Sequence, residues 1–129
     1  MAGEAHVIIA SRDANSLTDA AGGMTGGHPV KQLVCDVAKP ADIANLVDSV
    51  HREFGRIDTL INVAGVNRRK PALEVSEDDY DFVMDINVKG AWLLAQAVGR
   101  HQVRAGHGSQ INISSLNNDK PLTNVAPTP

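Results

Sequence analysis

The sequence has little cysteine, few aromatic residues and no long apolar run. Cys35 is the only cysteine among 129 residues, so no intrachain disulfide can form and a reducing cytoplasm is the expected location. No stretch approaches the length of about 18 apolar residues that a membrane span requires. The amino terminus also lacks the basic start and apolar core of a signal peptide. We therefore expect a cytoplasmic protein that makes no use of a membrane.

Aromatic residues make up 3% of the chain and the net charge is -3. The basic residues are scattered except for the run 68–70, and no aromatic residues that could stack on bases interleave with them. These features argue against nucleic-acid binding, and we expect no metal site. Apolar residues at 43% and charged residues at 21% are typical of a globular protein. A chain of this length suffices for one domain that buries roughly 65 to 70% of its unfolded surface.

Apolar patterns predict strands and helices that alternate along the chain. The expected strands span residues 6–10, 33–37, 57–63 and 110–115, and the expected helices span 13–21, 40–54 and 76–105. Pro40 suits the first turn of the second helix and Gly55 closes it. Ser76 and Asp79 supply a start to the third helix that resembles a capping box. Strands that alternate with helices predict βαβ units and a parallel sheet, with no internal repeat and no second domain.

The strand expected at 57–63 organises the rest of the chain. Its apolar residues point to both faces, which is typical of a strand buried between two helix layers. It ends in Ala64 and Gly65. A small residue followed by glycine lets a ligand or another backbone come close, and open α/β sheets bind ligands at this end of their strands. A tight exit from the strand explains the same residues equally well.

Five short motifs occur in one order along the chain. They are Val7–Arg12, Cys35–Val37, Asn62–Gly65, Asp85–Val88 and Ile113–Ser115. Together they resemble the short-chain dehydrogenase/reductase family over nearly the whole chain, from about residue 5 to 127. The resemblance implies an NAD(P)-dependent oxidoreductase with an α/β Rossmann-like fold, a doubly wound parallel sheet. Residues 1–129 would form an incomplete domain of this kind.

The resemblance also bears on the cofactor. Family members that bind NAD carry an acidic residue at the end of the second strand, where Ser11 and Arg12 stand in this chain. A hydroxyl and a guanidinium suit the 2′-phosphate of NADP, because arginine binds phosphate with paired, charge-assisted donors. The resemblance therefore favours NADP(H) over NAD(H). A solvated arginine after a strand is the alternative.

Further cofactor contacts are implied by two other motifs. Asp36 matches the residue that hydrogen-bonds the adenine amino group, with Val37 beside the ring, although Asp36 could equally be an ordinary aspartate at a strand end. Asn62, Ala64 and Gly65 match the Asn-Asn-Ala-Gly motif, whose backbone passes the cofactor ribose and steadies the central sheet. A valine replaces the second asparagine of that motif in this chain.

Two residues match positions of the family's catalytic apparatus. Ser115 matches the serine that holds the carbonyl or alcohol oxygen of the substrate, whereas a lone pair of serines after a strand is more often turn chemistry. Asn87 matches the asparagine that bends its helix and holds a proton-relay water, and a core amide with satisfied hydrogen bonds is the alternative. The only tyrosine, Tyr80, is followed at the required spacing by Met84. The family's Tyr-x-x-x-Lys motif, which supplies the proton, is therefore absent.

The loop after the central motif indicates a substrate class. Residues 65–71 resemble the branch that contains gluconate 5-dehydrogenase and 2-deoxygluconate 3-dehydrogenase, in which paired arginines lie near the substrate mouth. Arg68 and Arg69 would then attract an anionic sugar acid. A solvated loop explains these residues equally well.

The resemblance implies a chain truncated at both ends, since the glycine-rich turn is also absent. The family's strand order, 3-2-1-4-5-6-7, places the missing first strand between the strands at Val7 and Ile57, and the carboxyl-terminal strands are missing as well. We therefore expect a chain that is inactive alone, whereas a complete parent would act on a small-molecule substrate. We also expect a homo-oligomer, formed through the helix at 76–105 or the unpaired strand edges. The alternative is a non-catalytic module that binds a partner chain or, weakly, a nucleotide.

Overall fold

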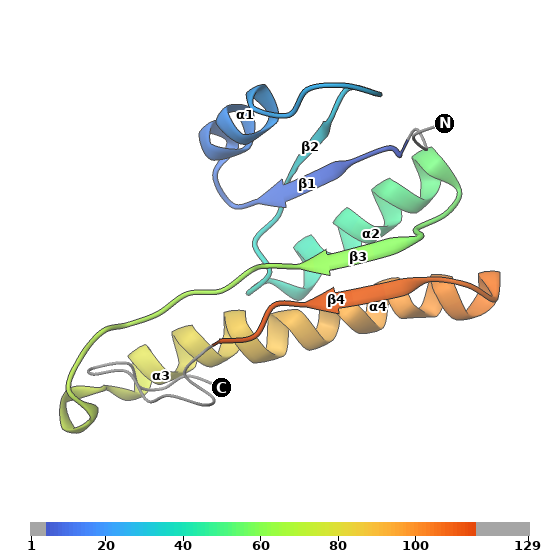
Figure 1. Cartoon of the computed structure of the whole chain (residues 1–129). Helices are drawn as coiled ribbons and strands as arrows, with labels where there is room; N and C mark the ends of the chain where they lie inside the picture. Colours follow the sequence, from blue (N-terminus) through green and yellow to red (C-terminus); the bar gives the residue numbers. More distant parts are fainter. Residues whose placement is uncertain (1–4, 116–129) are drawn as a thin grey trace.

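The computed structural model describes residues 5–115, in which strands and helices alternate as predicted (Figure 1). The strands are β1 (Ile8–Ser11), β2 (Lys31–Val34), β3 (Thr59–Asn62) and β4 (Ser109–Asn112). The helices are α1 (Ala14–Gly22), α2 (Pro40–Phe54), the 3-10 turn η1 (Ala72–Glu74), α3 (Glu77–Met84), the π-helical segment η2 (Asp85–Gly90) and α4 (Ala91–Ala105). Among the described residues, no helix is long and apolar enough to cross a membrane.

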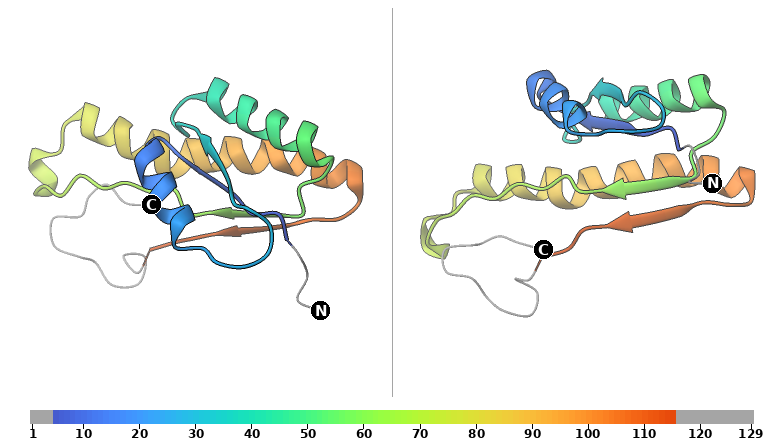
Figure 2. Two further views of the ribbon diagram at one scale, coloured as in Figure 1. Left: turned by 90° about the horizontal axis from the view of Figure 1, so that it is seen from above. Right: turned by 45° about the horizontal axis from the view of Figure 1, so that its top comes forward.

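The strands form two separate parallel pairs. β1 pairs with β2 and β3 pairs with β4, and no ladder joins β1 to β3 within residues 5–115. In Figure 1, β1 and β3 run in the same direction as members of two different strand pairs, and Figure 2 gives two further views of these pairs. The predicted α/β fold with parallel strands is thus confirmed, and the sheet is divided where the sequence analysis expected a strand to be missing.

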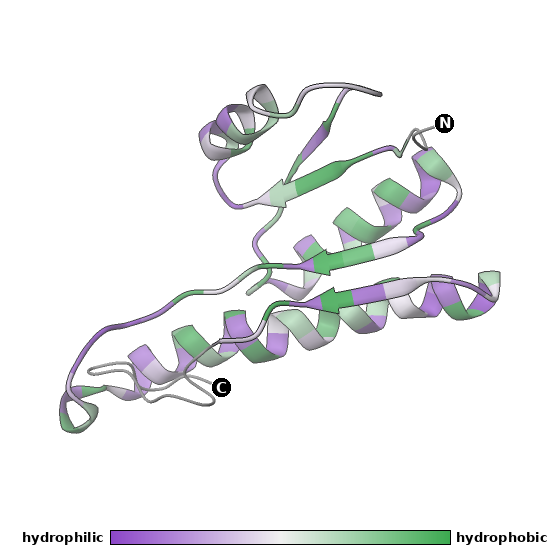
Figure 3. Cartoon of the chain, in the orientation of Figure 1, coloured by the Kyte–Doolittle hydropathy of each residue, from purple (hydrophilic) through white to green (hydrophobic). Residues whose placement is uncertain are grey.

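The strands are shorter than predicted, and the central one is less buried. The strand expected at 57–63 is reduced to β3, and the other three are also shifted or shortened to four residues each. Ile61 and Val63 are 58% and 66% exposed, so the prediction of a strand buried between two helix layers is wrong. Helices of the described chain cover only one face of the β3–β4 pair. Figure 3 shows apolar residues on β1, β3 and β4.

Two helix starts and their ends follow the predicted signals. Pro40 opens α2, and Gly55 ends it with a left-handed φ of 72° that glycine adopts without strain. At the start of α3 the Ser76 hydroxyl accepts from the Asp79 backbone N–H, while the Asp79 carboxylate accepts from the Ser76 backbone N–H. The predicted continuous helix over 76–105 is interrupted by η2, and Gly106 ends it.

The core lies between α2 and α4 and reaches the end of β2. Its buried members are Cys35, Ile43, Val47, Leu94 and Val98. Partly buried apolar residues from the β3 region extend this cluster. The single cysteine, Cys35, is buried in this cluster.

Candidate functional site

The predicted site residues follow the carboxyl ends of the parallel strands. Ser11 ends β1, Asp36 follows β2, Gly65 follows β3 and Ser115 follows β4. In Figure 1 the arrowheads of β1, β3 and β4 point to the same side of the molecule. Open α/β sheets bind their ligands at this edge, so the parallel topology brings the predicted residues to one side of the fold.

At the carboxyl end of β1, Arg12 lies next to the start of α1. The Ser11 hydroxyl lies 3.5 Å from the Asp13 backbone N–H, which donates to it. The Asp13 carboxylate caps α1 by accepting from the backbone N–H groups of Asn15 and Ser16. A hydrogen bond from the Ser16 hydroxyl, followed by these backbone bonds, lowers the pKa of Asp13. Arg12 is exposed and makes no ion pair within residues 5–115, so its guanidinium faces solvent.

Asp36 is engaged in the turn that leads to α2. Its carboxylate accepts from the Ala38 backbone N–H at 3.0 Å, and its own N–H donates to the Asp42 carboxylate at 3.0 Å. Val37 is partly buried against the core. A Cβ placed on Gly90 would stand 2.5 Å from the Val37 carbonyl oxygen, so the helix passes this turn at a distance that only glycine allows.

The β3 exit combines a buried amide with an open loop. Asn62 is buried, and its side-chain NH₂ donates to the Asn112 side-chain oxygen of β4 at 3.4 Å. Ala64 and Gly65 are exposed. A Cβ on Gly65 would meet the Asn87 Oδ1 at 3.7 Å, an ordinary contact, so the structure has room for a methyl group at this position.

Asn87 holds this loop against the helix. Its Oδ1 accepts from the Val66 backbone N–H, and its Nδ2 donates to the Val66 carbonyl oxygen, both at 2.8 Å. The residue lies in η2, where the helix departs from α geometry. A π-helical segment is often found at a functional site. The amide therefore positions the loop that carries the basic run 68–70.

The three basic residues of that loop have different environments. The Arg68 guanidinium lies 4.1 Å from the centroid of the Phe82 ring. Lys70 forms an ion pair with Asp79, and this hydrogen bond together with those from Ser76 lowers the pKa of Asp79 to about 2. Arg69 is exposed and has no ion pair among the described residues. The helix α3 thus holds two of the cations and leaves the third to solvent.

Ser115 is exposed beyond the end of β4, and its neighbour Ser114 is exposed as well. Tyr80 lies in the first half of α3 and is 47% exposed. Residues 116–129, which follow Ser115 in the chain, lie outside the described residues. Within residues 5–115 no group of three or more His, Cys, Asp or Glu side chains could hold a metal ion.

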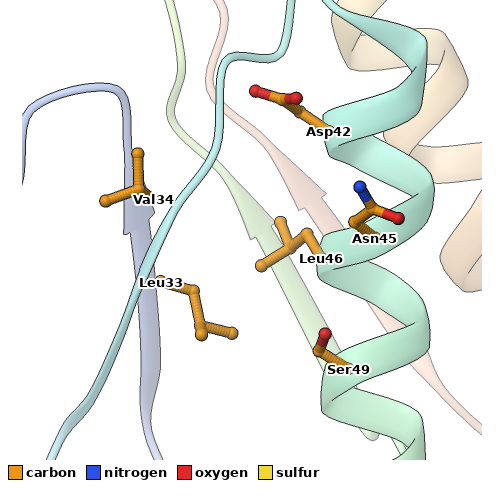
Figure 4. A pocket seen from close by; sticks show the side chains of 6 residues that line it. All are labelled: Leu33, Val34, Asp42, Asn45, Leu46 and Ser49. Atoms are coloured by element: carbon orange, nitrogen blue, oxygen red, sulfur yellow. The ribbon is translucent and has the colours of Figure 1, made fainter.

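A hollow of about 150 Å³ opens between β2 and α2. Leu33 and Leu46 face one another across it (Figure 4). Its other lining residues are Val34, Asp42, Asn45 and Ser49. None of the predicted cofactor residues lines it, although one lining residue, Asp42, accepts a hydrogen bond from the Asp36 backbone N–H.

Sequence reasoning missed one buried polar residue, Gln102. Its Nε2 lies 3.3 Å from the Ile57 carbonyl oxygen, 3.2 Å from that of Asp58 and 3.1 Å from that of Ser109. The side chain therefore joins the end of α4 to the starts of β3 and β4. A glutamine in helical register with the buried residues Leu94 and Val98 was the available signal.

Comparison with known proteins yields one family. Residues 1–127 match the family model described as short chain dehydrogenase. D-threitol dehydrogenase of Mycolicibacterium smegmatis is 41% identical over 111 residues, which cover 86% of this chain and 42% of the relative. The chain spans less than half the length of the curated relatives that it matches.

Two solved structures are similar along nearly the whole chain. A gluconate 5-dehydrogenase from Burkholderia cenocepacia in complex with NADP and tartrate superimposes with a TM-score of 0.81 at 32% identity, covering 95% of this chain and 49% of that one. An NAD+-bound xylitol dehydrogenase gives a TM-score of 0.84 at 30% identity, covering 94% of this chain and 47% of that one.

Proposed function

The chain belongs to the short-chain dehydrogenase/reductase family, and we propose that it forms part of an NAD(P)-dependent oxidoreductase. The substrate in this proposal is a sugar-acid-like molecule with a hydroxyl or carbonyl group, in keeping with the gluconate 5-dehydrogenase among the similar structures. The nicotinamide cofactor supplies or accepts the hydride. The observation that carries the proposal is the placement of Arg12, Asp36, Gly65 and Ser115 at the carboxyl ends of parallel strands.

The residues present fit the adenosine end of such a cofactor. Arg12 has a solvent-facing guanidinium with no ion pair in the described chain, beside the hydroxyl of Ser11. This pair suits a ribose 2′-phosphate, so NADP(H) is the proposed cofactor. The similar structures hold NADP in one case and NAD+ in another, so the preference rests on Arg12. The sequence contains no glycine-rich turn that could receive the pyrophosphate.

In the proposed site, the substrate end is shaped by the loop after β3. Ser115 orients the reacting oxygen by a hydrogen bond. Asn87 is a positioning residue, since both polar ends of its side chain hold Val66 and thereby the loop with Arg68 and Arg69. Arg69 supplies a free positive charge for a carboxylate, and Arg68 is kept over Phe82. The exposed guanidinium of Arg69 and the guanidinium of Arg68, which is stacked on Phe82, together favour an anionic substrate.

A nucleotide titration tests the cofactor proposal without relying on turnover. We expect 2′,5′-ADP to bind at least about tenfold more tightly than 5′-AMP, because a charge-assisted hydrogen bond to phosphate contributes about 1.5 to 3 kcal/mol. Arg12→Ala should remove this difference. Arg52→Ala, which alters an exposed arginine in the last turn of α2, is the matched control. Equal affinities for the two nucleotides would refute an NADP site.

We also propose that residues 1–129 alone do not catalyse hydride transfer, since the sequence has no Tyr-x-x-x-Lys. The purified chain, its mass verified, is to be incubated with NADPH and a keto-gluconate while absorbance is followed. No oxidation of NADPH is expected. Turnover that co-purifies with the chain and is lost in Ser115→Ala would contradict this expectation.

Self-association through the long helix is a further part of the proposal. Val88, Trp92 and Val103 are exposed at spacings that place them on one stripe, with Trp92 at 67% and Val103 at 82%. Large exposed apolar side chains in a row are typical of an interaction surface. Light scattering should give a mass above that of the monomer, and Trp92→Glu should lower it. A monomeric mass for the unaltered chain at all concentrations would contradict this proposal.

A further inference from the structure

Two neighbouring arginines in the loop after β3 are held in different ways. The Arg68 guanidinium carbon lies 4.1 Å from the centroid of the Phe82 ring, which belongs to α3 and is partly buried. Arg69 is exposed and makes no ion pair, hydrogen bond or ring contact among the described residues. The side chain of Arg68 therefore has a fixed direction, and that of Arg69 does not.

The chain on both sides of Arg68 is attached to the neighbouring helical segments. Two residues earlier, the Val66 backbone is hydrogen-bonded in both directions to the Asn87 amide. Two residues later, Lys70 forms an ion pair with Asp79 of α3. Figure 1 shows this loop as it leaves the carboxyl end of β3 and leads to α3. The stacked guanidinium is thus held by the loop backbone as well as by the ring.

The stack leaves the hydrogen-bonding groups of Arg68 available. Stacking occupies a flat face of a guanidinium, whereas its N–H donors lie at the edge of the plane. Within residues 5–115, the N–H groups of Arg68 have no hydrogen-bond or ion-pair partner. A planar fork of such donors matches the two oxygens of a carboxylate. Because the ring already restricts its side chain, Arg68 loses less conformational freedom on binding than an unrestricted arginine loses.

We propose that Arg68 binds the carboxylate of the substrate by its N–H edge and thereby selects a sugar acid over a neutral sugar. Phe82 is a positioning residue, which acts through Arg68 and does not touch the substrate. Arg69 contributes attraction over a distance, which salt screens. This assignment rests on the proposed function, and it adds which arginine determines the specificity and which residue holds that arginine.

A sugar-acid titration of the full chain tests the assignment. Binding is followed by NMR at the backbone amides of residues 66–70 and at the Nε–Hε group of Arg68. The ligands are D-gluconate and its neutral counterpart D-glucitol, at constant ionic strength. We expect a saturable shift with D-gluconate and at least about tenfold weaker binding of D-glucitol, because D-glucitol forms no charge-assisted hydrogen bonds with Arg68.

Lysine substitutions separate the roles of the two arginines. Arg68→Lys keeps the charge but removes the planar fork, and it should weaken D-gluconate binding at least about tenfold. Arg69→Lys is the matched control, because it keeps the charge at the neighbouring position. It should bind D-gluconate within about twofold of the unaltered chain.

Variants of Phe82 test the positioning role. Phe82→Leu removes the ring and should weaken D-gluconate binding at least about threefold, whereas Phe82→Tyr keeps the ring and should bind within about twofold of the unaltered chain. Phe82→Met, which also lacks a ring, takes the place of Phe82→Leu if the leucine variant does not fold. A stack with a purely structural role would change the free energy of unfolding without changing the preference for D-gluconate over D-glucitol.

Three results would overturn the assignment. The first is the absence of a saturable shift with D-gluconate. The second is an equal loss of affinity in Arg69→Lys and Arg68→Lys, which would leave Arg68 no special role. The third is unchanged D-gluconate binding by the variant that lacks the ring at position 82. The nucleotide titration at Arg12 tests the cofactor proposal separately, so a chain that prefers 2′,5′-ADP but fails these tests would refute only the role of Arg68.

Discussion

The side chain of Asn87 is hydrogen-bonded to both main-chain polar groups of Val66, at 2.8 Å in each direction. The two residues are 21 positions apart and belong to different parts of the fold, the π-helical segment η2 and the loop that leaves β3. The Asn87 amide therefore forms the two backbone hydrogen bonds that a neighbouring strand would otherwise supply to Val66. It thereby fixes the course of the loop that carries residues 68–70. A glutamine, longer by one methylene, or an aspartate, which only accepts, could not reproduce both bonds.

Replacing Asn87 should destabilise the fold. Asn87→Ala leaves the partly buried N–H and C=O of Val66 without their partners, at a cost of about 1 to 3 kcal/mol. Urea unfolding followed by circular dichroism measures this. Asn67→Ala, which alters an exposed asparagine of the same loop, should cost less than about 0.5 kcal/mol. Equal stabilities for the two variants would show that the Val66 contact contributes nothing.

A methyl group at Gly90 should disturb the start of α4. Gly90→Ala places Cβ 2.5 Å from the Val37 carbonyl oxygen, which belongs to the backbone and cannot rotate away. We expect a loss of about 1 to 3 kcal/mol, which is typical of overpacking. Gly99→Ala is the control, because its Cβ would meet only the flexible end of Gln110 at 3.4 Å. An alanine at 90 that leaves the melting temperature unchanged would mean that the helix can move away from the turn.

The ion pair between Lys70 and Asp79 at the start of α3 should make the free energy of unfolding depend on pH in the acidic range. The pKa of Asp79 is lowered to about 2, first by the hydrogen bond from Lys70 and then by those from Ser76. An aspartate with a lowered folded-state pKa stabilises the fold above its unfolded value near 3.8, and this contribution is lost as the pH falls toward 2. Asp79→Asn should flatten the stability profile in this window, as measured by urea unfolding. Glu77→Gln, which removes a neighbouring carboxylate, should keep the slope.

Protonation of His101 in mild acid should weaken the contact between α2 and α4, where the rings of His51 and His101 are stacked. Their ring centroids are 4.0 Å apart. Burial, followed by the charges of His51 and Arg104 and opposed by Asp48, lowers the pKa of His101 below 6.5. The folded state then prefers the neutral ring, so its stability is complete above pH 6.5 and decreases as the pH falls below that value. An NMR titration of His101 with a midpoint at or above 6.5 would contradict this prediction.

The features that the sequence predicted correctly depend on neighbouring residues in the chain. Pro40 and Gly55 fix the ends of α2 through their own backbone preferences, and Ser76 and Asp79 cap α3 within one turn. The π-helical segment could not be predicted in this way. Its surroundings include the close contact of Gly90 with the turn after β2, which is a tertiary contact.

The apolar pattern of β3 predicted burial that the described chain does not provide. Leu60 and Ile61 are both apolar, but α4 covers only the face of Leu60. Apolar residues indicate that a strand is suited to pack against another apolar surface. The apolar pattern does not specify whether the element that covers the strand belongs to the same chain. The exposure of Ile61 follows from the lack of such an element in residues 5–115.

The site was predictable in its outline and not in its contacts. Parallel strands place their carboxyl ends together, so the positions of Arg12 and Gly65 at one edge followed from the alternation of strands and helices. The stacking of Arg68 on Phe82 and the pairing of Asn87 with Val66 depend on the course of one irregular loop. No local pattern specifies that course.

The separation of the two strand pairs also bears on how the chain folds, since each pair closes over its own connection. The hydroxyls of Thr59 and Ser109 are 2.9 Å apart although the two residues are 50 positions apart in the sequence, and most of the connection is helical. Helices form within about a microsecond, and they shorten the loop that must close before β3 meets β4. The β1–β2 pair closes over a much shorter connection. We therefore expect each pair to nucleate without the other, and the packing of α2 against α4 to join them.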